Sequence, residues 1–348
     1  MSLIDIKSLS KADILVFLKG EGYPDYRANQ IYLWLVKGVC SFDEMLNIPK
    51  DLRCKLQEKC YIANAKIERK LVSKIDGTIK YLFKLHDSEF VESVLMKYKH
   101  GYTICISTQV GCKMGCKFCA TGKSGFSRNL TASEMLAQIQ TAQLDNQIRI
   151  SNVVLMGMGE PLDNYDNVVQ FLRLVSSEDN LNIGMRHISL STCGIINKIY
   201  NLADENFQLT LSISLHAPND SIRNNLMPIN KKFNVDELLR ACKFYIKKTN
   251  RRISFEYAMI SGVNDSDECA VELAHKLSGM LCHVNLIPVN NIDFDKNFYE
   301  KSNRERLEKF MSILSKYGIN ATMRRTLGSD INASCGQLRR NNVTDLEV

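Results

Sequence analysis

The 348-residue chain contains little proline and glycine and has no long apolar run. Only 6 prolines and 18 glycines are present, against 45% hydrophobic residues, which excludes a collagen-like or largely disordered chain. No apolar stretch approaches the ~20 residues that a membrane-spanning helix needs. Residues 1–5 form neither a basic segment nor a long apolar one. We therefore expect a folded cytoplasmic protein of about two domains that does not span a membrane.

Acidic residues are absent from one long segment of a chain whose net charge is +7. Residues 97–128 contain six basic residues and no Asp or Glu. Residues 223–252 contain nine basic residues against two acidic ones, and residues 62–84 contain six against two. Such segments attract polyanions, although a solvated surface explains any one of them about equally well. Because the 12 cysteines accompany no export signal, the composition favours free thiols and metal ligation over disulfides.

The first part of the chain has the apolar spacing of short helices. We predict helices over 11–19, 26–37 and 51–60, with Ser10 as the N-cap of the first and Gly38 ending the second. An Asp-Gly pair at 76–77 then separates two alternating runs, 67–73 and 79–85, which predicts a hairpin.

Beyond residue 100 the pattern alternates between strands and helices. The expected strands are 103–108, 152–156, 187–191, 208–214, 253–258 and 283–287, and the expected helices are 131–144, 166–176, 194–204, 234–248, 266–279 and 301–317. Six such units predict an α/β fold with a parallel sheet, too few for a closed eight-stranded barrel. We expect a helical accessory domain at 1–62, a β-hairpin linker at 63–96, a barrel with a C-terminal loop at 97–340, and a tail at 341–348.

The most specific motif is a C-x3-C-x2-C loop formed by Cys112, Cys116 and Cys119. Three thiolates on one loop can bind three irons of a [4Fe–4S] cluster and leave the fourth iron open. An open iron can chelate S-adenosylmethionine and transfer an electron to its sulfonium. The alternative is a zinc site with Cys105 as the fourth ligand, but zinc sites usually contain paired C-x2-C arms and only one such pair is present.

With the Phe before its last Cys, this motif resembles the radical S-adenosylmethionine superfamily, whose fold is a partial (β/α)6 barrel. The loop at 157–161, Gly-Met-Gly-Glu-Pro, resembles the superfamily's segment for the amino group of S-adenosylmethionine, with Gly159 allowing close approach and Glu160 pairing with the ammonium. Taken alone, the loop would be an ordinary turn. Further candidate cosubstrate residues follow later strands: Ser191, Ser214, Leu215, His216 and Asn290. His216 could equally be a structural residue at the barrel rim.

Four segments together resemble one family, the RlmN-type dual-specificity RNA (adenine-C2)-methyltransferases. They are 109–112 (Gln-Val-Gly-Cys), 157–162 (Gly-Met-Gly-Glu-Pro-Leu), 214–219 (Ser-Leu-His-Ala-Pro-Asn) and 334–338 (Ser-Cys-Gly-Gln-Leu). The resemblance covers nearly the whole chain and implies that residues 1–62 bind RNA. It implies 23S ribosomal RNA and transfer RNA as substrates, an electron donor such as flavodoxin, and a monomeric protein. One departure is visible, because Val289 and Asn291 flank Asn290 where the family commonly has Trp and Pro.

The resemblance also implies roles for three further residues. Cys335 accepts a methyl group from one S-adenosylmethionine, and a 5′-deoxyadenosyl radical from a second molecule abstracts hydrogen from that methyl group, so that two molecules are consumed per turnover. The resulting radical adds to C2 of adenine, Glu92 removes the C2 proton, and Cys105 releases the product as a disulfide forms. On residue type alone, Cys105 would be a small buried side chain and Glu92 a strand-face charge.

Two rival functions stay open at this point. A Cfr-type enzyme shares this machinery but methylates C8 of adenine, and no single residue separates the two types. A non-catalytic iron–sulfur or zinc protein that binds RNA would also account for the basic segments.

Overall fold

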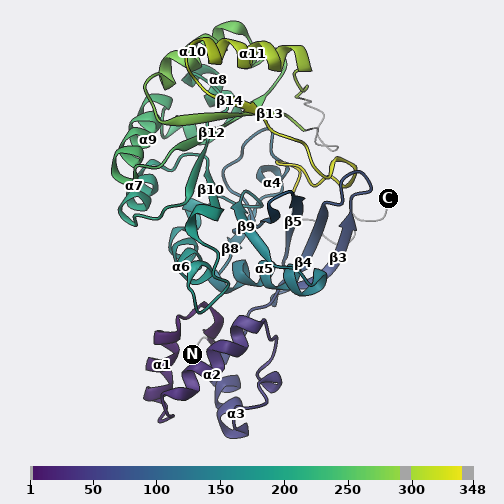
Figure 1. The fold of residues 1–348 in the computed structure, drawn as a ribbon, viewed down its shortest axis with the longest axis vertical. Coiled ribbons are helices and arrows are strands. Elements are labelled where there is room, and N and C mark those ends of the chain that lie inside the picture. Colours follow the sequence, from purple (N-terminus) through teal and green to yellow (C-terminus); the bar gives the residue numbers. More distant parts are fainter. Residues whose placement is uncertain (1–2, 291–298, 339–348) are drawn as a thin grey trace.

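The computed structural model describes residues 3–290 and 299–338 and contains one large sheet beside a helical module (Figure 1). The sheet has ten strands in the order β14-β13-β12-β11-β10-β9-β6-β5-β4-β3. Strands β6 to β14 of this sheet run parallel, and β3, β4 and β5 continue it in antiparallel fashion. The predicted tail at 341–348 lies outside the described residues.

The parallel part confirms the predicted strand–helix alternation and adds one strand. Its strands are β6 (Gly101–Cys105), β9 (Ile150–Leu155), β10 (Ile188–Thr192), β11 (Thr210–Ser214), β12 (Ile253–Met259), β13 (Cys282–Pro288) and β14 (Ala321–Met323). Its long helices are α5 (Ala132–Asn146), α6 (Tyr165–Ser176), α7 (Ile196–Asp204), α9 (Val235–Thr249), α10 (Asp267–Leu277) and α11 (Arg304–Lys316). The short helices α4 (Ala120–Lys123) and α8 (Asp220–Leu226), and the small pair β7 (Gln109–Gly111) and β8 (Phe126–Asn129), follow strand ends. The added strand, β14, is only three residues long and shows no alternation.

The N-terminal module forms its own hydrophobic cluster. It contains α1 (Lys11–Gly20), α2 (Tyr26–Lys37), α3 (Lys50–Lys59), and a two-strand pair of β1 (Ile4–Asp5) and β2 (Cys60–Tyr61). Ser10 caps α1 as predicted, in a capping box with Asp13, and Gly38 ends α2 at a φ of 86°. The module contacts α5 through Ser133, whose hydroxyl donates to Asp5 at 2.6 Å.

Residues of the expected linker belong to the barrel sheet. The predicted hairpin is formed by β3 (Lys66–Val72) and β4 (Ile79–Lys84), and β5 (Phe90–Tyr98) joins it to β6. The region is therefore a three-stranded extension at one edge of the barrel. Figure 1 places β3 and β4 beside the C-terminal segment, drawn in yellow.

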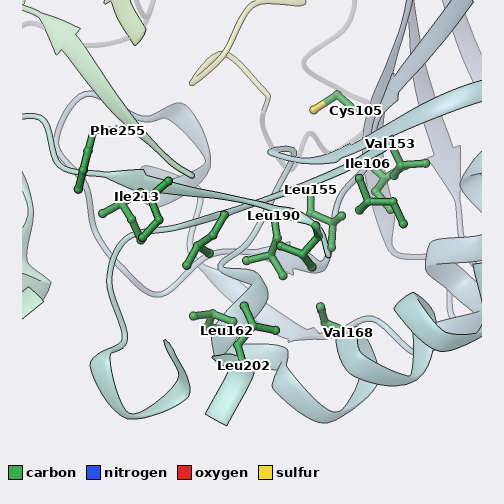
Figure 2. Packing of buried hydrophobic residues seen from close by; sticks show 14 of the residues in the cluster. Cys105, Ile106, Val153, Leu155, Leu162, Val168, Leu190, Leu202, Ile213 and Phe255 are labelled. Carbon is green, nitrogen blue, oxygen red and sulfur yellow. The ribbon is translucent and has the colours of Figure 1, made fainter. Parts of the chain in front are cut away.

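Side-chain alternation divides the sheet into an apolar outer face and a more polar inner face. Aliphatic side chains such as Leu155, Leu190 and Ile213 are buried in the layer between strands and helices (Figure 2). Cys105 lies apart from these side chains in the same view. Within the described residues, the helices are too short or too polar to cross a membrane.

Candidate active site

Ten of the thirteen predicted site residues line one cavity at the C-terminal ends of the parallel strands. They are Cys112, Cys116, Cys119, Gly159, Glu160, Ser191, Ser214, His216, Asn290 and Cys335. The other three, Glu92, Cys105 and Leu215, do not line this cavity. Parallel strands end at the same edge of a sheet, which is why residues almost 180 positions apart meet here.

The cysteine loop leaves β7 at a position that requires glycine. Gly111 has a φ of 77°, and a Cβ there would lie 1.9 Å from the carbonyl oxygen of Gly125. The loop is held by backbone bonds, since Cys112 N donates to Gly125 at 2.8 Å and Lys117 N donates to Leu226 at 3.0 Å. The fold of the loop therefore does not depend on its thiols.

The three loop thiols fit an iron–sulfur cubane better than a single ion. Burial raises the pKa of Cys112 to about 12 and also raises that of Cys116, so both are neutral until a cation binds. In the described part of the chain, no three His, Cys, Asp or Glu side chains converge on one metal position. A cubane takes each thiolate on a different iron, so convergence on one point is not required.

The loop after β9 presents a buried carboxylate toward the cavity. Gly159 has a φ of 103°, and a Cβ there would lie 2.6 Å from the Gln109 side chain, whose carbonyl accepts from Glu160 N at 2.9 Å. The Glu160 carboxylate accepts from the amides of Leu162 at 3.0 Å and Cys193 at 2.7 Å. Burial raises its pKa, and no lysine or arginine of the described residues pairs with it. A ligand ammonium would supply that missing positive charge, which fits the amino group of S-adenosylmethionine.

The strand-end residues differ in their availability to a ligand. Ser191 and Ser214 face each other with 3.4 Å between their hydroxyl oxygens. The His216 ring accepts from Ala258 N at 2.9 Å, and burial lowers its pKa to about 3, so the ring is neutral with its remaining N–H on Nε2. Its ring lies edge-on to Phe118 with 4.8 Å between centroids. Leu215 is buried and its carbonyl accepts from Arg223 at 3.0 Å, and its assignment as a cosubstrate residue stays a prediction.

Arg223 is a site-supporting residue that the sequence did not indicate. Its guanidinium is 1% exposed and donates to the carbonyls of Leu215, Ser214 and Cys193 at 2.7–3.0 Å. These carbonyls lie at the ends of the neighbouring strands β10 and β11, so Arg223 fixes the spacing of the two strand ends. Cys193 also lines the cavity.

The segment that carries Cys335 is tethered at several points. Asp330 accepts from the Ser73 hydroxyl at 2.7 Å and from Lys74 N at 2.9 Å, both near the hairpin turn. Asn290 donates to the Cys335 carbonyl at 3.0 Å. Gly336 accepts from Ala120 N at 2.8 Å. Contacts from the hairpin turn, from Ala120 directly after the cysteine loop and from Asn290 after β13 thus hold the segment of Cys335 in place. Asn291 lies outside the described residues.

Cys105, Cys335 and Arg324 are close enough to shift one another's pKa values. Burial raises the pKa of Cys105 to about 12, and the nearby Cys335 adds to that rise while Arg324 opposes it. The charges of Cys335, then of Glu256 and Cys105, raise the pKa of Arg324. All twelve cysteines are free thiols, so the disulfide implied for the end of a turnover is not present in this structure. Cys40 and Cys54 are exposed.

Glu92 is on the same face of the sheet as Cys105 but is paired with a lysine. Register places Val94 opposite both Lys80 and Cys105, so the side chains of Lys80, Glu92 and Cys105 point to one side. Lys80 Nζ lies 2.8 Å from the Glu92 carboxylate and 3.1 Å from the Asn332 carbonyl. Lys80 therefore joins Glu92 to the loop of Cys335.

Removal of Lys80 should be costly because both partners are buried. Lys80→Met leaves the Glu92 carboxylate without its cation, and we expect the free energy of unfolding to fall by about 3–5 kcal/mol. Lys70→Met is a matched control, since the Lys70–Asp145 pair is more exposed and should contribute at most about 1 kcal/mol. Urea denaturation measures both changes. Equal losses in the two variants would contradict the assignment, and adding Glu92→Gln to Lys80→Met should recover part of the loss.

Comparisons with known proteins agree with this geometry over the whole chain. Residues 106–274 match the model of the radical SAM superfamily, and residues 4–62 match the ribosomal RNA large subunit methyltransferase N-terminal domain. The chain is 55% identical over 340 residues to a probable dual-specificity RNA methyltransferase RlmN from Alkaliphilus oremlandii, covering 98% of each chain. The chain belongs to the RlmN family. A relative of the same description from Clostridium tetani is 54% identical over 97% of each chain.

A solved structure confirms the radical SAM fold. A crystal structure of a radical SAM methyltransferase from Sphaerobacter thermophilus matches with a TM-score of 0.91 at 43% identity, covering 97% of this chain and all of that one. As a member of the RlmN family, the chain is an S-adenosylmethionine-dependent RNA methyltransferase of the radical SAM superfamily. The superfamily implies a [4Fe–4S] cluster and S-adenosylmethionine as cofactors. The predicted family, fold class and enzyme class are confirmed.

Proposed function

We propose that the chain methylates C2 of adenine in 23S ribosomal RNA and in transfer RNA. The observation that carries this proposal is the placement of two thiols outside the cluster motif near Arg324: Cys335 lines the cavity of the cysteine loop, and Cys105, outside the cavity lining, is close enough to interact with Cys335 and Arg324. C2 of adenine lies between two ring nitrogens and is electron-poor, so it does not attack a sulfonium methyl as an amine does. A protein-bound one-carbon unit that adds to C2 as a radical avoids this limit.

Cys112, Cys116 and Cys119 would hold the cluster, and Glu160 with Ser191, Ser214, His216 and Asn290 would bind S-adenosylmethionine. When bound there, the cluster and cosubstrate supply a carbon radical by one-electron reduction, with electrons from a donor such as flavodoxin. Two molecules of S-adenosylmethionine per turnover follow from this scheme, one as methyl donor and one as radical source. The buried, uncompensated Glu160 and the neutral loop thiols support this assignment.

Cys335 would carry the one-carbon unit and Cys105 would release the product. In the first step Cys335 Sγ gains a methyl group from a sulfonium, its S–H proton leaves, and the sulfonium S–C bond breaks. In the last step the Cys105 thiolate forms an S–S bond to Cys335, the S–C bond to the base breaks, and the electron pair goes to carbon, which takes up a proton. The raised pKa of Cys105 keeps it protonated, and so unreactive, for most of the cycle.

Glu92 is the proposed acceptor of the C2 proton, and the unpaired electron left on the base after radical addition would return to the cluster held by the loop thiols, which restores the aromatic ring. It lies on the same sheet face as Cys105, but its pairing with Lys80 means that proton transfer needs this ion pair to open. Because Lys80 also binds the Asn332 carbonyl, a movement of the Cys335 loop would change the environment of Glu92.

Mass spectrometry of nucleosides tests the proposed function. Ribosomal and transfer RNA from cells with and without this protein should differ in 2-methyladenosine. Appearance of 8-methyladenosine instead would support the Cfr-type activity, and unchanged RNA in both fractions would reject the proposal. A binding protein without catalysis would also fail to form 5′-deoxyadenosine from S-adenosylmethionine on reduction.

The basic hairpin should contribute to RNA affinity through phosphate contacts. Lys66 and Lys74 are exposed on or beside β3, whereas Lys70 and Lys80 of the same region are paired with Asp145 and Glu92. We expect Lys66→Gln/Lys74→Gln to weaken RNA binding and to reduce the slope of log affinity against log salt by about 0.7–0.9 per lost contact. Fluorescence anisotropy over a salt series measures the slope. The matched control is Lys301→Gln/Lys316→Gln, which removes two exposed lysines from the C-terminal part of the barrel. Equal salt slopes for the two double variants would rule out phosphate contacts by Lys66 and Lys74.

A further inference from the structure

The interior of the barrel is polar well below the cavity of the cysteine loop. Parallel barrels usually fill this space with Val, Ile and Leu. Here a second cavity, toward the N-terminal strand ends, is lined by small polar side chains that alternate along the strands. They include Ser189, Ser212, Ser254 and Asn285. The interior can therefore accept a polar ligand from the side opposite the cysteine loop.

Three residues form the boundary between the two cavities. Met156, Glu256 and Arg324 line both of them. A molecule that enters from the polar side and reaches toward Cys335 must pass these three side chains. In the proposed function, S-adenosylmethionine occupies the cavity of the cysteine loop. An RNA base that enters from the polar cavity would therefore meet the protein at these three boundary residues.

Glu256 has one carboxylate oxygen engaged and one without a hydrogen-bond partner. Its Oε1 accepts from the Ser254 hydroxyl and the Asn285 amide, each at 3.1 Å. Its Oε2 is buried and accepts no hydrogen bond in the described structure. The nearest cation is Arg324 Nη1 at 3.6 Å, beyond hydrogen-bond distance. Buried carboxylate oxygens are normally satisfied, so Oε2 indicates an absent donor.

Arg324 supplies the complementary donor next to the reactive thiols. Its backbone N–H bonds to the Leu286 carbonyl at 2.9 Å, which fixes it beside β13. Its Nη1 approaches the Met156 sulfur at 3.5 Å, a weak acceptor that a better one could replace. Arg324 lines the same cavity as Glu256 and Cys335, and the charges of both raise its pKa.

We propose that Glu256 and Arg324 read the Watson–Crick edge of the target adenine, with Glu256 Oε2 accepting from the N6 amino group and Arg324 donating to N1. The inference rests on the proposed function and deepens it. C2 is bonded to N1, so a donor at N1 next to Cys335 brings C2 to the thiol, while C8 lies on the opposite edge of the purine. Guanine presents O6 and N1–H at these positions, which places acceptor against acceptor and donor against donor.

Modified RNA hairpins test each contact separately. The probes are synthetic hairpins with adenosine, purine riboside (no N6 amino group) or 1-deazaadenosine (no N1 acceptor) at the position that mass spectrometry identifies. We expect the wild-type protein to bind the adenosine hairpin about ten-fold or more tightly than either analogue, as for hydrogen bonds to charged groups. Glu256→Met should lose only the preference over purine riboside, and Arg324→Met only the preference over 1-deazaadenosine. Fluorescence anisotropy gives the dissociation constants.

Further variants separate recognition from folding. Glu256→Gln keeps an acceptor and the bonds to Ser254 and Asn285, so it should retain part of the preference even if Glu256→Met unfolds. Glu268→Gln, an exposed charge change on α10, should retain both preferences. The proposal is wrong if Glu256→Met or Glu256→Gln keeps the full wild-type preference over purine riboside, or if the wild type has none. It is also wrong if Glu256→Met raises the KM for S-adenosylmethionine and keeps the base preference. Absence of 2-methyladenosine in cellular RNA would instead reject the proposed function itself.

Discussion

Replacing Cys112, Cys116 and Cys119 together by alanine will give a folded protein that binds no iron and does not cleave S-adenosylmethionine. The three thiols line one wall of the cavity, and no other cysteine of the loop can replace them. The loop itself is held by backbone bonds to Gly125 and Leu226, and by the positive φ of Gly111, none of which involves a thiol. Iron analysis, the visible absorption of the reconstituted protein and 5′-deoxyadenosine formation measure the loss, which should be complete.

The control for this variant must remove thiols without touching the cavity. Cys40 and Cys54 are exposed in the N-terminal module, far along the chain from the cysteine loop. Cys40→Ala/Cys54→Ala should therefore load iron and form 5′-deoxyadenosine as the wild type does. Circular dichroism should give the same fold for both variants. Iron loading or cosubstrate cleavage that survives in the triple variant would refute the cluster assignment.

Local sequence patterns predicted most of the fold because its elements are long and regular. Alternation and helical spacing identified the parallel strands β6 and β9 to β13 and the long helices between them to within a few residues, and Ser10 and Gly38 marked helix ends correctly. The short strands β7 and β8 and the short helices α4 and α8 were not predicted. The sequence did not predict β14, which has three residues and is formed by pairing with β13. Short strands depend on a neighbour and not on their own residues.

The sequence predicted the site best where all the functional residues of a motif lie in one loop. The cysteine loop and the Gly157–Glu160 turn are contiguous, so spacing alone identified them. Residues that act through a distant partner were missed or misjudged. Lys80 meets Glu92 only through the register of β4 and β5, and Arg223 meets three carbonyls only because the strands β10 and β11 end together. No one-dimensional pattern records these contacts.

The buried boundary residues illustrate the same limit. Glu256 lies in a strand that is buried on both faces, and Arg324 lies in a basic pair just after a short strand. What points to a function is that Glu256 is buried with one carboxylate oxygen lacking a hydrogen-bond partner, 3.6 Å from Arg324. Both features arise only in the assembled barrel. Charged residues inside a sheet are rarely tolerated without a partner, so their position is a functional signal only once the structure is known.

The two thiols outside the cluster motif should give variants that differ in kind. Cys335→Ala should load its cluster yet form neither methylated RNA nor a covalent protein–RNA adduct, because the atom that carries the one-carbon unit is gone. Cys105→Ala should accept the methyl group and add to the base, but then stop with RNA attached through Cys335, because no thiol remains to break the S–C bond. Loss of a merely structural cysteine would only lower the free energy of unfolding, by at most a few kcal/mol.

Denaturing gels of RNA copurified with each variant distinguish these outcomes. The adduct should be present in Cys105→Ala and absent from the Cys105→Ala/Cys335→Ala double variant, and Cys193→Ala, a cavity cysteine without an assigned chemical step, should not accumulate it. In the wild type, adduct release should accelerate with rising pH. The pKa of Cys105 is about 12, so its reactive thiolate fraction rises about ten-fold per pH unit below that value. A Cys105→Ala protein with an intact cluster and no adduct, or an adduct that persists without Cys335, would overturn the assignment of the two thiols.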